Sequence, residues 1–237
     1  NSYQSLSEVR ITSDSGATLY FSAVTPSSNT VSFSGGTPIP VSTSSAQFKV
    51  RLTPKTHAAM PAPPGLSYAV GGTVTAFTST NTQSGNDSST PATITVDNLS
   101  PNGATSVSGS AGNAANTINW TASNSADFDT TNGSVILRWA SGSAGSEVPA
   151  EGNSSYAAGN TITTATVACV ISSAASASLS KTDGTGGSAG CTTSALTNGQ
   201  AYTYKAFQRD TRGNYDVGVL IGTFTPILPT TTLATSA

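Results

Sequence analysis

The strongest constraint on this chain is a two-residue alternation of apolar and polar side chains, which recurs along the sequence without a helical period. It is clearest over residues 47–52, where Phe48, Val50 and Leu52 alternate with polar neighbours. Successive side chains of a strand point to opposite faces, so this pattern predicts strands with one buried and one solvated face. No amphipathic helix of useful length is expected. The sequence therefore predicts an all-β protein of antiparallel sheets.

The first 98 residues predict one sandwich of about seven short strands. The expected strands lie at residues 9–11, 19–23, 31–33, 47–52, 68–70, 74–77 and 92–98, with Ile94 and Val96 of the last one facing inward. A proline-rich stretch at 57–65 is incompatible with a central strand. We interpret it as a connection between two sheets; the alternative is a pre-extended recognition segment. His57, at its start, is expected to be a solvated loop residue.

The segment Val96-Asp97-Asn98-Leu99-Ser100-Pro101 resembles the joint between tandem immunoglobulin-like modules of bacterial surface proteins. Asp97 and Asn98 can cap the strand end through side-chain hydrogen bonds to the backbone. The resemblance implies an immunoglobulin-like β-sandwich over 1–98, a second sandwich over 99–226 and an extended tail over 227–237.

The second domain resembles a fibronectin type III domain over roughly residues 101–226. Trp120 lies in an alternating strand similar to the second strand of that family, which carries a core Trp. Leu196 is followed by an Asn-Gly turn and then by Tyr202, six residues after the Leu, as in the tyrosine corner of the family. The resemblance implies that Trp120 and Leu196 are core residues. It also implies that Tyr202 buries its ring and bonds its hydroxyl to upstream backbone.

Two cysteines, Cys169 and Cys191, lie 22 positions apart. As zinc ligands they would need two partners nearby, and His57, the only histidine, is remote in sequence. In an exported β protein an even cysteine count predicts one disulfide, worth roughly 3 kcal/mol for a loop of this length. Two free buried thiols in a cytosolic protein are the alternative.

Low charge excludes several function classes. Only 8% of the residues are charged and the net charge is −2, which argues against nucleic-acid binding. No apolar run approaches the roughly 20 residues of a membrane span. The acidic residues are scattered over loops, and there is no G-x-S-x-G motif. We therefore expect no enzymatic activity and no cofactor.

Two features allow ligands or modifications without demanding them. Asp127, Asp129 and Asn132 lie close together and form a weak calcium candidate, although a calcium site needs about six oxygens. Capping of turns is the alternative that we favour. Five Asn-x-Ser/Thr sequons and the Ser/Thr-rich loops are candidate glycan acceptors. The sequons are at Asn86, Asn98, Asn119, Asn132 and Asn153.

The surface is polar without being ionic, since the chain holds 38 Ser and 38 Thr. A polar start without an initiator Met fits a chain processed after export, and fits a trimmed chain equally. We expect a non-catalytic extracellular subunit of a surface or pilus-like filament, with other copies or another filament subunit as partners. An adhesin or carbohydrate- or protein-binding module, and an accessory fragment of a secreted enzyme, remain alternatives. The tail at 227–237, or the first strand near Val9 and Ile11, is expected to contact a neighbouring subunit.

Overall fold

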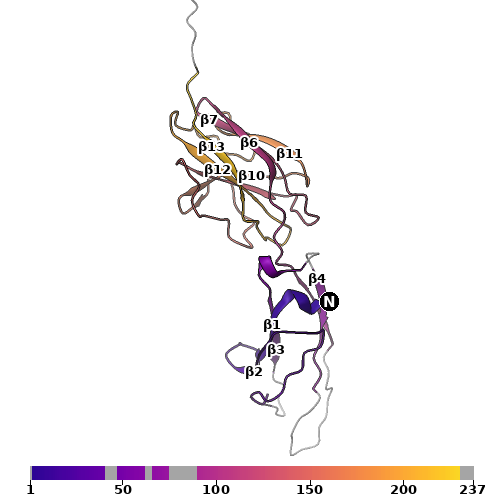
Figure 1. Ribbon diagram of the computed structural model, residues 1–237. Helices are drawn as coiled ribbons and strands as arrows, with labels where there is room; N and C mark the ends of the chain where they lie inside the picture. Colours follow the sequence, from indigo (N-terminus) through magenta and orange to yellow (C-terminus); the bar gives the residue numbers. More distant parts are fainter. Residues whose placement is uncertain (1, 41–46, 62–65, 75–89, 230–237) are drawn as a thin grey trace, which may run out of the picture. The chain divides into compact units, whose positions relative to one another are not determined.

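The computed structural model describes residues 2–40, 47–61, 66–74 and 90–229. Every strand pairing in these residues is antiparallel, so the predicted all-β fold is confirmed (Figure 1). The helices of the described part are short 3-10 turns, η1 (Ser2–Ser5) and η2 (His57–Ala59), and none of them is long or apolar enough to cross a membrane. The chain divides into two compact units, unit 1 (Asn1–Leu99) and unit 2 (Ser100–Ala237).

The described residues of unit 1 form two small sheets. One has the order β2-β1-β3, and the other pairs β4 with β5. Their bounds are β1 (Leu6–Ser13), β2 (Leu19–Val24), β3 (Phe48–Pro54), β4 (Leu66–Val70) and β5 (Ala92–Val96). In β5, Ile94 and Val96 are half-buried, whereas their neighbours Thr93 and Thr95 are exposed, as the alternation predicted.

The strand predicted at 31–33 is absent. The chain there is irregular, and Phe33 packs its ring against Phe21 of β2, with 5.7 Å between the ring centroids. The backbone N–H of Thr37 then donates to the carbonyl of Tyr20 at 2.7 Å. The polar turn formers and glycines on either side leave too short a run to pair as a strand, so the segment folds back on β2. The strand predicted at 74–77 lies almost wholly outside the described residues.

The burial predicted for β3 is also wrong. Phe48 and Val50, expected in the core, are 44% and 37% exposed. The reason is topological: β3 is an edge strand that pairs only with β1 in its sheet. Arg51, expected on the wet face, is half-buried because it bonds to Thr12 of β1.

Unit 2 contains a three-stranded and a five-stranded sheet. Their orders are β11-β7-β6 and β13-β12-β8-β10-β9. The bounds are β6 (Thr105–Gly112), β7 (Ala115–Thr121), β8 (Ser134–Trp139), β9 (Thr161–Ile162), β10 (Ala165–Ile171), β11 (Ser178–Gly184), β12 (Tyr202–Gln208) and β13 (Val219–Phe224).

The five-stranded sheet of unit 2 is apolar on both faces. On one face Ile136 joins a buried cluster that includes Trp120 of the three-stranded sheet. On the other face Val135 and Leu137 join a second buried cluster, against which Tyr156 of the long 140–165 segment packs. A strand buried on both faces reads as a continuous apolar run, which explains the sequence Val-Ile-Leu at the centre of β8. The long segment therefore acts as a cover for the outer face.

Candidate functional site

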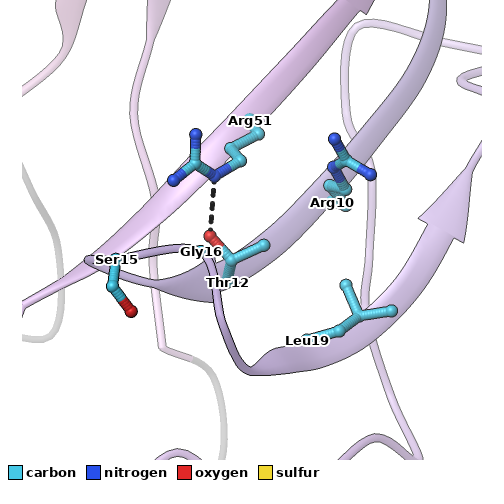
Figure 2. Close-up of a pocket in the computed structure, with 6 residues that line it drawn as sticks. All are labelled: Arg10, Thr12, Ser15, Gly16, Leu19 and Arg51. Carbon is cyan, nitrogen blue, oxygen red and sulfur yellow. Dashed lines mark hydrogen bonds between the residues drawn. The ribbon is translucent and has the colours of Figure 1, made fainter.

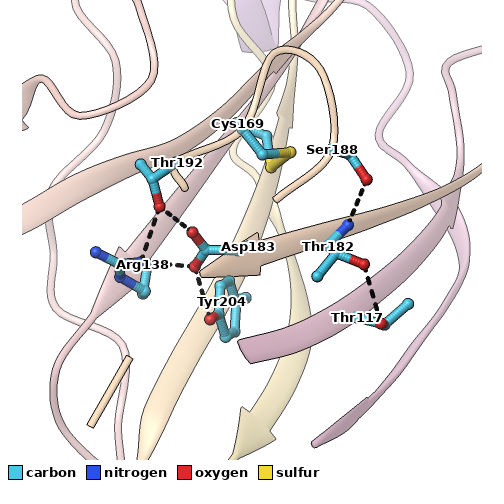
Figure 3. Close-up of a disulfide and its surroundings, with 9 residues drawn as sticks. Thr117, Arg138, Cys169, Thr182, Asp183, Ser188, Thr192 and Tyr204 are labelled. Atoms are coloured by element: carbon cyan, nitrogen blue, oxygen red, sulfur yellow. Dashed lines mark hydrogen bonds and ion pairs between the residues drawn. A yellow bond between two sulfur atoms is a disulfide. The ribbon is translucent and has the colours of Figure 1, made fainter. Parts of the chain in front are cut away.

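The predicted disulfide is present in unit 2 (Figure 3). Cys169 lies in β10 and Cys191 follows β11, and both are buried in the core between the sheets. Backbone hydrogen bonds flank the bridge on both sides, from Val170 N to Gly190 O and from Thr192 N to Ala168 O, each 2.8 Å long. The disulfide therefore attaches the end of the 172–190 excursion to the five-stranded sheet.

Beside the disulfide lies a buried ionic cluster centred on Asp183 of β11 (Figure 3). Its carboxylate is fully buried and accepts hydrogen bonds from Arg138 Nη1 at 2.7 Å and from Tyr204 Oη at 2.8 Å. The hydroxyl of Thr192, next to Cys191, donates to the same carboxylate. Arg138 lies on β8 and Tyr204 on β12, so the cluster joins the two sheets through charge-assisted hydrogen bonds.

Two further contacts surround the cluster. Asn116 of β7 donates through Nδ2 to Tyr204 Oη at 3.1 Å, and the Arg138 guanidinium lies 5.5 Å from the centroid of the Tyr202 ring. Burial, followed by the negative charge of Asp183, raises the pKa of Tyr204 well above its usual value. Tyr204 therefore stays protonated and keeps donating to Asp183. The arrangement links the two sheets through buried hydrogen bonds.

The three residues of the fibronectin type III resemblance all lie in the core cluster between the sheets. The hydroxyl of Tyr202 accepts a hydrogen bond from the backbone N–H of Thr197 at 3.0 Å, and its ring is buried. Trp120 donates from Nε1 to Ser134 Oγ at 3.2 Å. Leu196 is 5% exposed.

Two of the three calcium candidates, Asp129 and Asn132, have partners of their own. Asp129 forms an ion pair with Arg209 through Oδ2 and accepts from Thr131 N through Oδ1 at 2.8 Å. Asn132 accepts from Ser172 Oγ at 3.2 Å. These contacts correspond to the turn-capping role that the sequence left open. A nearby turn is capped in the same way: the fully buried carboxylate of Asp210 accepts from the backbone N–H groups of Arg212 and Asn214 at 2.8 and 2.9 Å.

Glu147 holds the long 140–165 segment. It accepts hydrogen bonds from Thr164 N at 3.1 Å and from Trp139 Nε1 at 2.8 Å, and also from the Thr164 hydroxyl. The hydrogen bonds from Thr164 and Trp139 lower the pKa of Glu147 from 4.5 to about 2. Glu147 is thus a carboxylate that fixes a loop over the outer sheet face.

The carboxyl group of Asp216 is buried, which disfavours its charged form. Its Oδ1 accepts from the backbone N–H groups of Gln208 at 2.8 Å and Gly218 at 3.1 Å, and its buried Oδ2 has no hydrogen-bond partner among the described residues. Burial raises the pKa of Asp216 to about 7, against the opposing effect of the two N–H donors. The carboxyl therefore titrates near neutral pH.

Unit 1 has a shallow hollow of about 330 Å³ that carries two arginines (Figure 2). Arg10 of β1 and Arg51 of β3 are direct partners across the strand pair. The Arg51 side chain reaches over Thr12 and donates from Nε to its hydroxyl at 2.8 Å. Leu19 of β2 and the turn residues Ser15 and Gly16 complete the wall. Both arginines therefore line the same small hollow.

A second hollow, of about 530 Å³, lies in unit 2 around Asn102, Thr105, Thr121 and Asn124. None of its lining residues is ionisable. It has no group that could act as a general acid, a general base or a charged anchor.

Sequence reasoning missed the buried pair Arg138–Asp183. One signal was available: Arg138 is the single charged residue in the otherwise apolar strand Val135–Trp139. A charge inside a strand that is buried on both faces needs a buried partner of opposite sign.

His57 lies in η2 and is half-buried, so the expectation of a solvated residue holds only partly. Of the sequons, Asn86 lies outside the described residues. The other four engage their side-chain amides in hydrogen bonds, namely Asn98 with Lys55 O, Asn119 with Ser108, Asn132 with Ser172 and Asn153 with Ser155. Their use as glycan acceptors stays a prediction.

No protein family matches this chain, and no curated protein or solved structure does so either.

Proposed function

We propose that this chain is a non-catalytic, extracellular structural subunit of a surface or filamentous assembly. The observation that carries the proposal is the use that unit 2 makes of its charged groups. Asp183 and Asp129 each bind a group far away along the chain, and Glu147 binds Thr164 at the end of its own long segment. Acids committed to internal contacts cannot serve as the paired, solvent-facing carboxylates that hydrolysis of glycans requires.

The disulfide supports the extracellular location. Structural disulfides persist in oxidising compartments and are rare in the cytosol. Cys169 and Cys191 are both buried in the core, away from reducing partners, so the bridge serves the fold and not redox chemistry. A subunit exposed to proteases and changing conditions benefits from such a covalent link.

The strand order supports a fibronectin type III-like identity for unit 2. Leaving aside the two-residue β9, its first, second and fifth strands form one sheet and its third, fourth, sixth and seventh form the other. A constant-type immunoglobulin sandwich differs only in placing the fourth strand beside the fifth. The position of Tyr202 at the start of β12, with its hydroxyl bonded to backbone upstream, agrees with the tyrosine corner of such domains.

Exposed apolar side chains near the end of unit 2 support assembly with a partner. Val217, Leu220, Ile227 and Leu228 are 84%, 56%, 61% and 69% exposed. They precede, belong to or follow β13, and large exposed apolar side chains are candidates for contact with a partner. The backbone N–H of Ile227 donates to Gly112 O at 3.0 Å, which aligns this stretch with the end of β6. We propose that other copies of this chain, or another subunit of the assembly, cover these side chains.

Negative-stain electron microscopy of protein released from its native source without denaturant tests the proposal. Regular fibres, layers or stalks that bind an antibody against this chain are the expected result. Dispersed single particles under the same conditions would contradict a structural role.

A second candidate, a binding module on a cell surface, is favoured by one observation. The hollow of unit 1 presents Arg10 and Arg51 beside each other on adjacent strands, which is an arrangement suited to an anion.

A further inference from the structure

The arginine hollow of unit 1 carries one positive charge that the described residues do not neutralise. Arg10 pairs with Glu8 at 3.4 Å and Lys49 pairs with Asp14 at 2.8 Å. Arg51 forms no ion pair with an acid anywhere in the described part of the chain. The surplus charge of this face therefore resides on the Arg51 guanidinium.

The sheet places a second arginine directly opposite Arg51. Arg10 and Arg51 are Cα partners in the β1–β3 ladder, so their side chains leave the same face of the sheet. Like charges at directly opposed positions destabilise a strand pair. An anion bound on this face offsets part of the repulsion between the two positive charges.

The Arg51 guanidinium is held in place before any ligand arrives. Nε donates to Thr12 Oγ1 at 2.8 Å and Nη2 donates to the carbonyl of Asp14 at 3.4 Å. Thr12 is almost fully buried, so its hydroxyl is a fixed anchor. Gly16 adopts a φ of +83° and lies so close that a Cβ there would be 2.9 Å from Nη2. The turn thus packs against the guanidinium, whose hydrogen bonds to the described residues run through Nε and Nη2.

We propose that this hollow binds the carboxylate of an acidic monosaccharide residue. One surplus positive charge matches a single negative charge, and a carboxylate oxygen can accept charge-assisted hydrogen bonds from the remaining guanidinium nitrogen of Arg51, Nη1, and from Arg10. Ser15 and the exposed turn backbone suit sugar hydroxyls, while Leu19, 49% exposed, offers an aliphatic surface to the C–H face of a ring. A volume of about 330 Å³ is at the small end for ligand sites and accommodates one sugar ring.

The test is a titration of the ¹⁵N-labelled full chain, followed by ¹H–¹⁵N correlation spectra that include the arginine Nε–H signals. The ligands are sodium glucuronate, methyl glucoside as the uncharged sugar and sodium sulfate as the sugar-free anion, all at one ionic strength. We expect glucuronate to shift the Arg51 Nε–H and the amides of Ser15 and Gly16 saturably, with millimolar affinity. Absence of a saturable shift, or equal shifts with methyl glucoside, would overturn the proposal. Sulfate binding as tight as glucuronate would reduce the site to a general anion patch and overturn its saccharide character.

Variants locate the binding. Arg51→Gln and Arg10→Gln should each weaken glucuronate binding about tenfold or more, because each removes a charge-assisted donor. Arg212→Gln is the matched control, since it removes the same charge from an exposed position in unit 2 and should leave the affinity unchanged. Arg10 is exposed, so Arg10→Gln should leave the fold of unit 1 intact. This variant therefore tests the location of glucuronate binding even where Arg51→Gln disturbs the fold. Unchanged affinity in Arg10→Gln would place the ligand elsewhere.

Discussion

Replacing Asp183 by asparagine removes one negative charge from the interior of unit 2 while keeping the shape of the side chain. The carboxylate is fully buried and accepts from Arg138, Tyr204 and Thr192. Asparagine places an N–H₂ group where one carboxylate oxygen accepted, so donors then face donors. Arg138 is left as a buried cation without its counter-charge.

The magnitude follows from the burial of the two partners. Removing one partner of a buried ion pair costs about 3–5 kcal/mol. The Arg138 side chain is 14% exposed and retains some hydration, which puts the expected loss near the lower end, about 3 kcal/mol. With a urea m-value of about 2 kcal/mol/M for a domain of this size, the unfolding midpoint should fall by about 1.5 M.

Urea unfolding, monitored by tryptophan fluorescence, reports the stability of unit 2, which contains Asp183. Both tryptophans of the chain, Trp120 and Trp139, are buried in unit 2. The matched control is Asp14→Asn, which breaks an exposed ion pair of similar length in unit 1, between side chains that are 53% and 55% exposed, and should leave the tryptophan transition in place.

A double-mutant cycle separates the ion pair from other effects. Arg138→Met removes the uncompensated cation, so the variant that combines it with Asp183→Asn should lose at least about 1 kcal/mol less than the sum of the single changes. A midpoint shift below about 0.3 M for Asp183→Asn, or strict additivity in the cycle, would refute the clamp role of Asp183.

Three further predictions follow from single contacts. Tyr202→Phe should destabilise unit 2 by about 1–2 kcal/mol in the same urea assay. The control Tyr156→Phe loses an equivalent but exposed hydrogen bond to its hydroxyl and should change stability by no more than about 0.5 kcal/mol. Equal losses in the two variants would contradict a buried tyrosine corner at Tyr202. The pKa of Asp216 is raised from 3.8 to about 7, so unit 2 should lose stability as pH rises from about 4 through 7. Asp216→Asn should remove that loss. If the stability of the variant fell with pH in parallel with that of the unchanged protein, Asp216 would not be the source. The pKa of Glu147 is lowered from 4.5 to about 2, so its stabilising contribution is complete above about pH 4.5 and is lost as pH falls toward 2. We expect the fluorescence of Trp139 to change over this range and Glu147→Gln to abolish the change. A fluorescence change of the same size and midpoint in that variant would exclude Glu147 as its source.

Features of the fold that rest on local pattern were accessible from the sequence. The inward-facing Ile94 and Val96 follow from two-residue alternation over a short run. The pairing of Cys169 with Cys191 follows from an even cysteine count in a chain that has the character of an exported protein. Each of these inferences needs only neighbouring residues or a residue inventory.

Features that depend on which elements meet in space were not accessible. Phe48 and Val50 carry a core-like pattern, yet β3 is an edge strand and leaves both exposed. Asp183 looks like an ordinary loop acid in sequence. Only the way β11 faces β8 and β12 of the other sheet reveals Arg138 as its partner. Alternation reports the direction of a side chain, and tertiary packing decides what covers it.

We propose that this chain is an exported building block whose second unit is closed by a disulfide. The most direct measurement is the intact mass of the protein taken from its native source, treated at once with an alkylating reagent under denaturing conditions and without reductant. We predict no added alkyl group, and two added groups after reduction of the same sample. Two alkyl groups on the unreduced protein would show free thiols at Cys169 and Cys191 and would contradict the account.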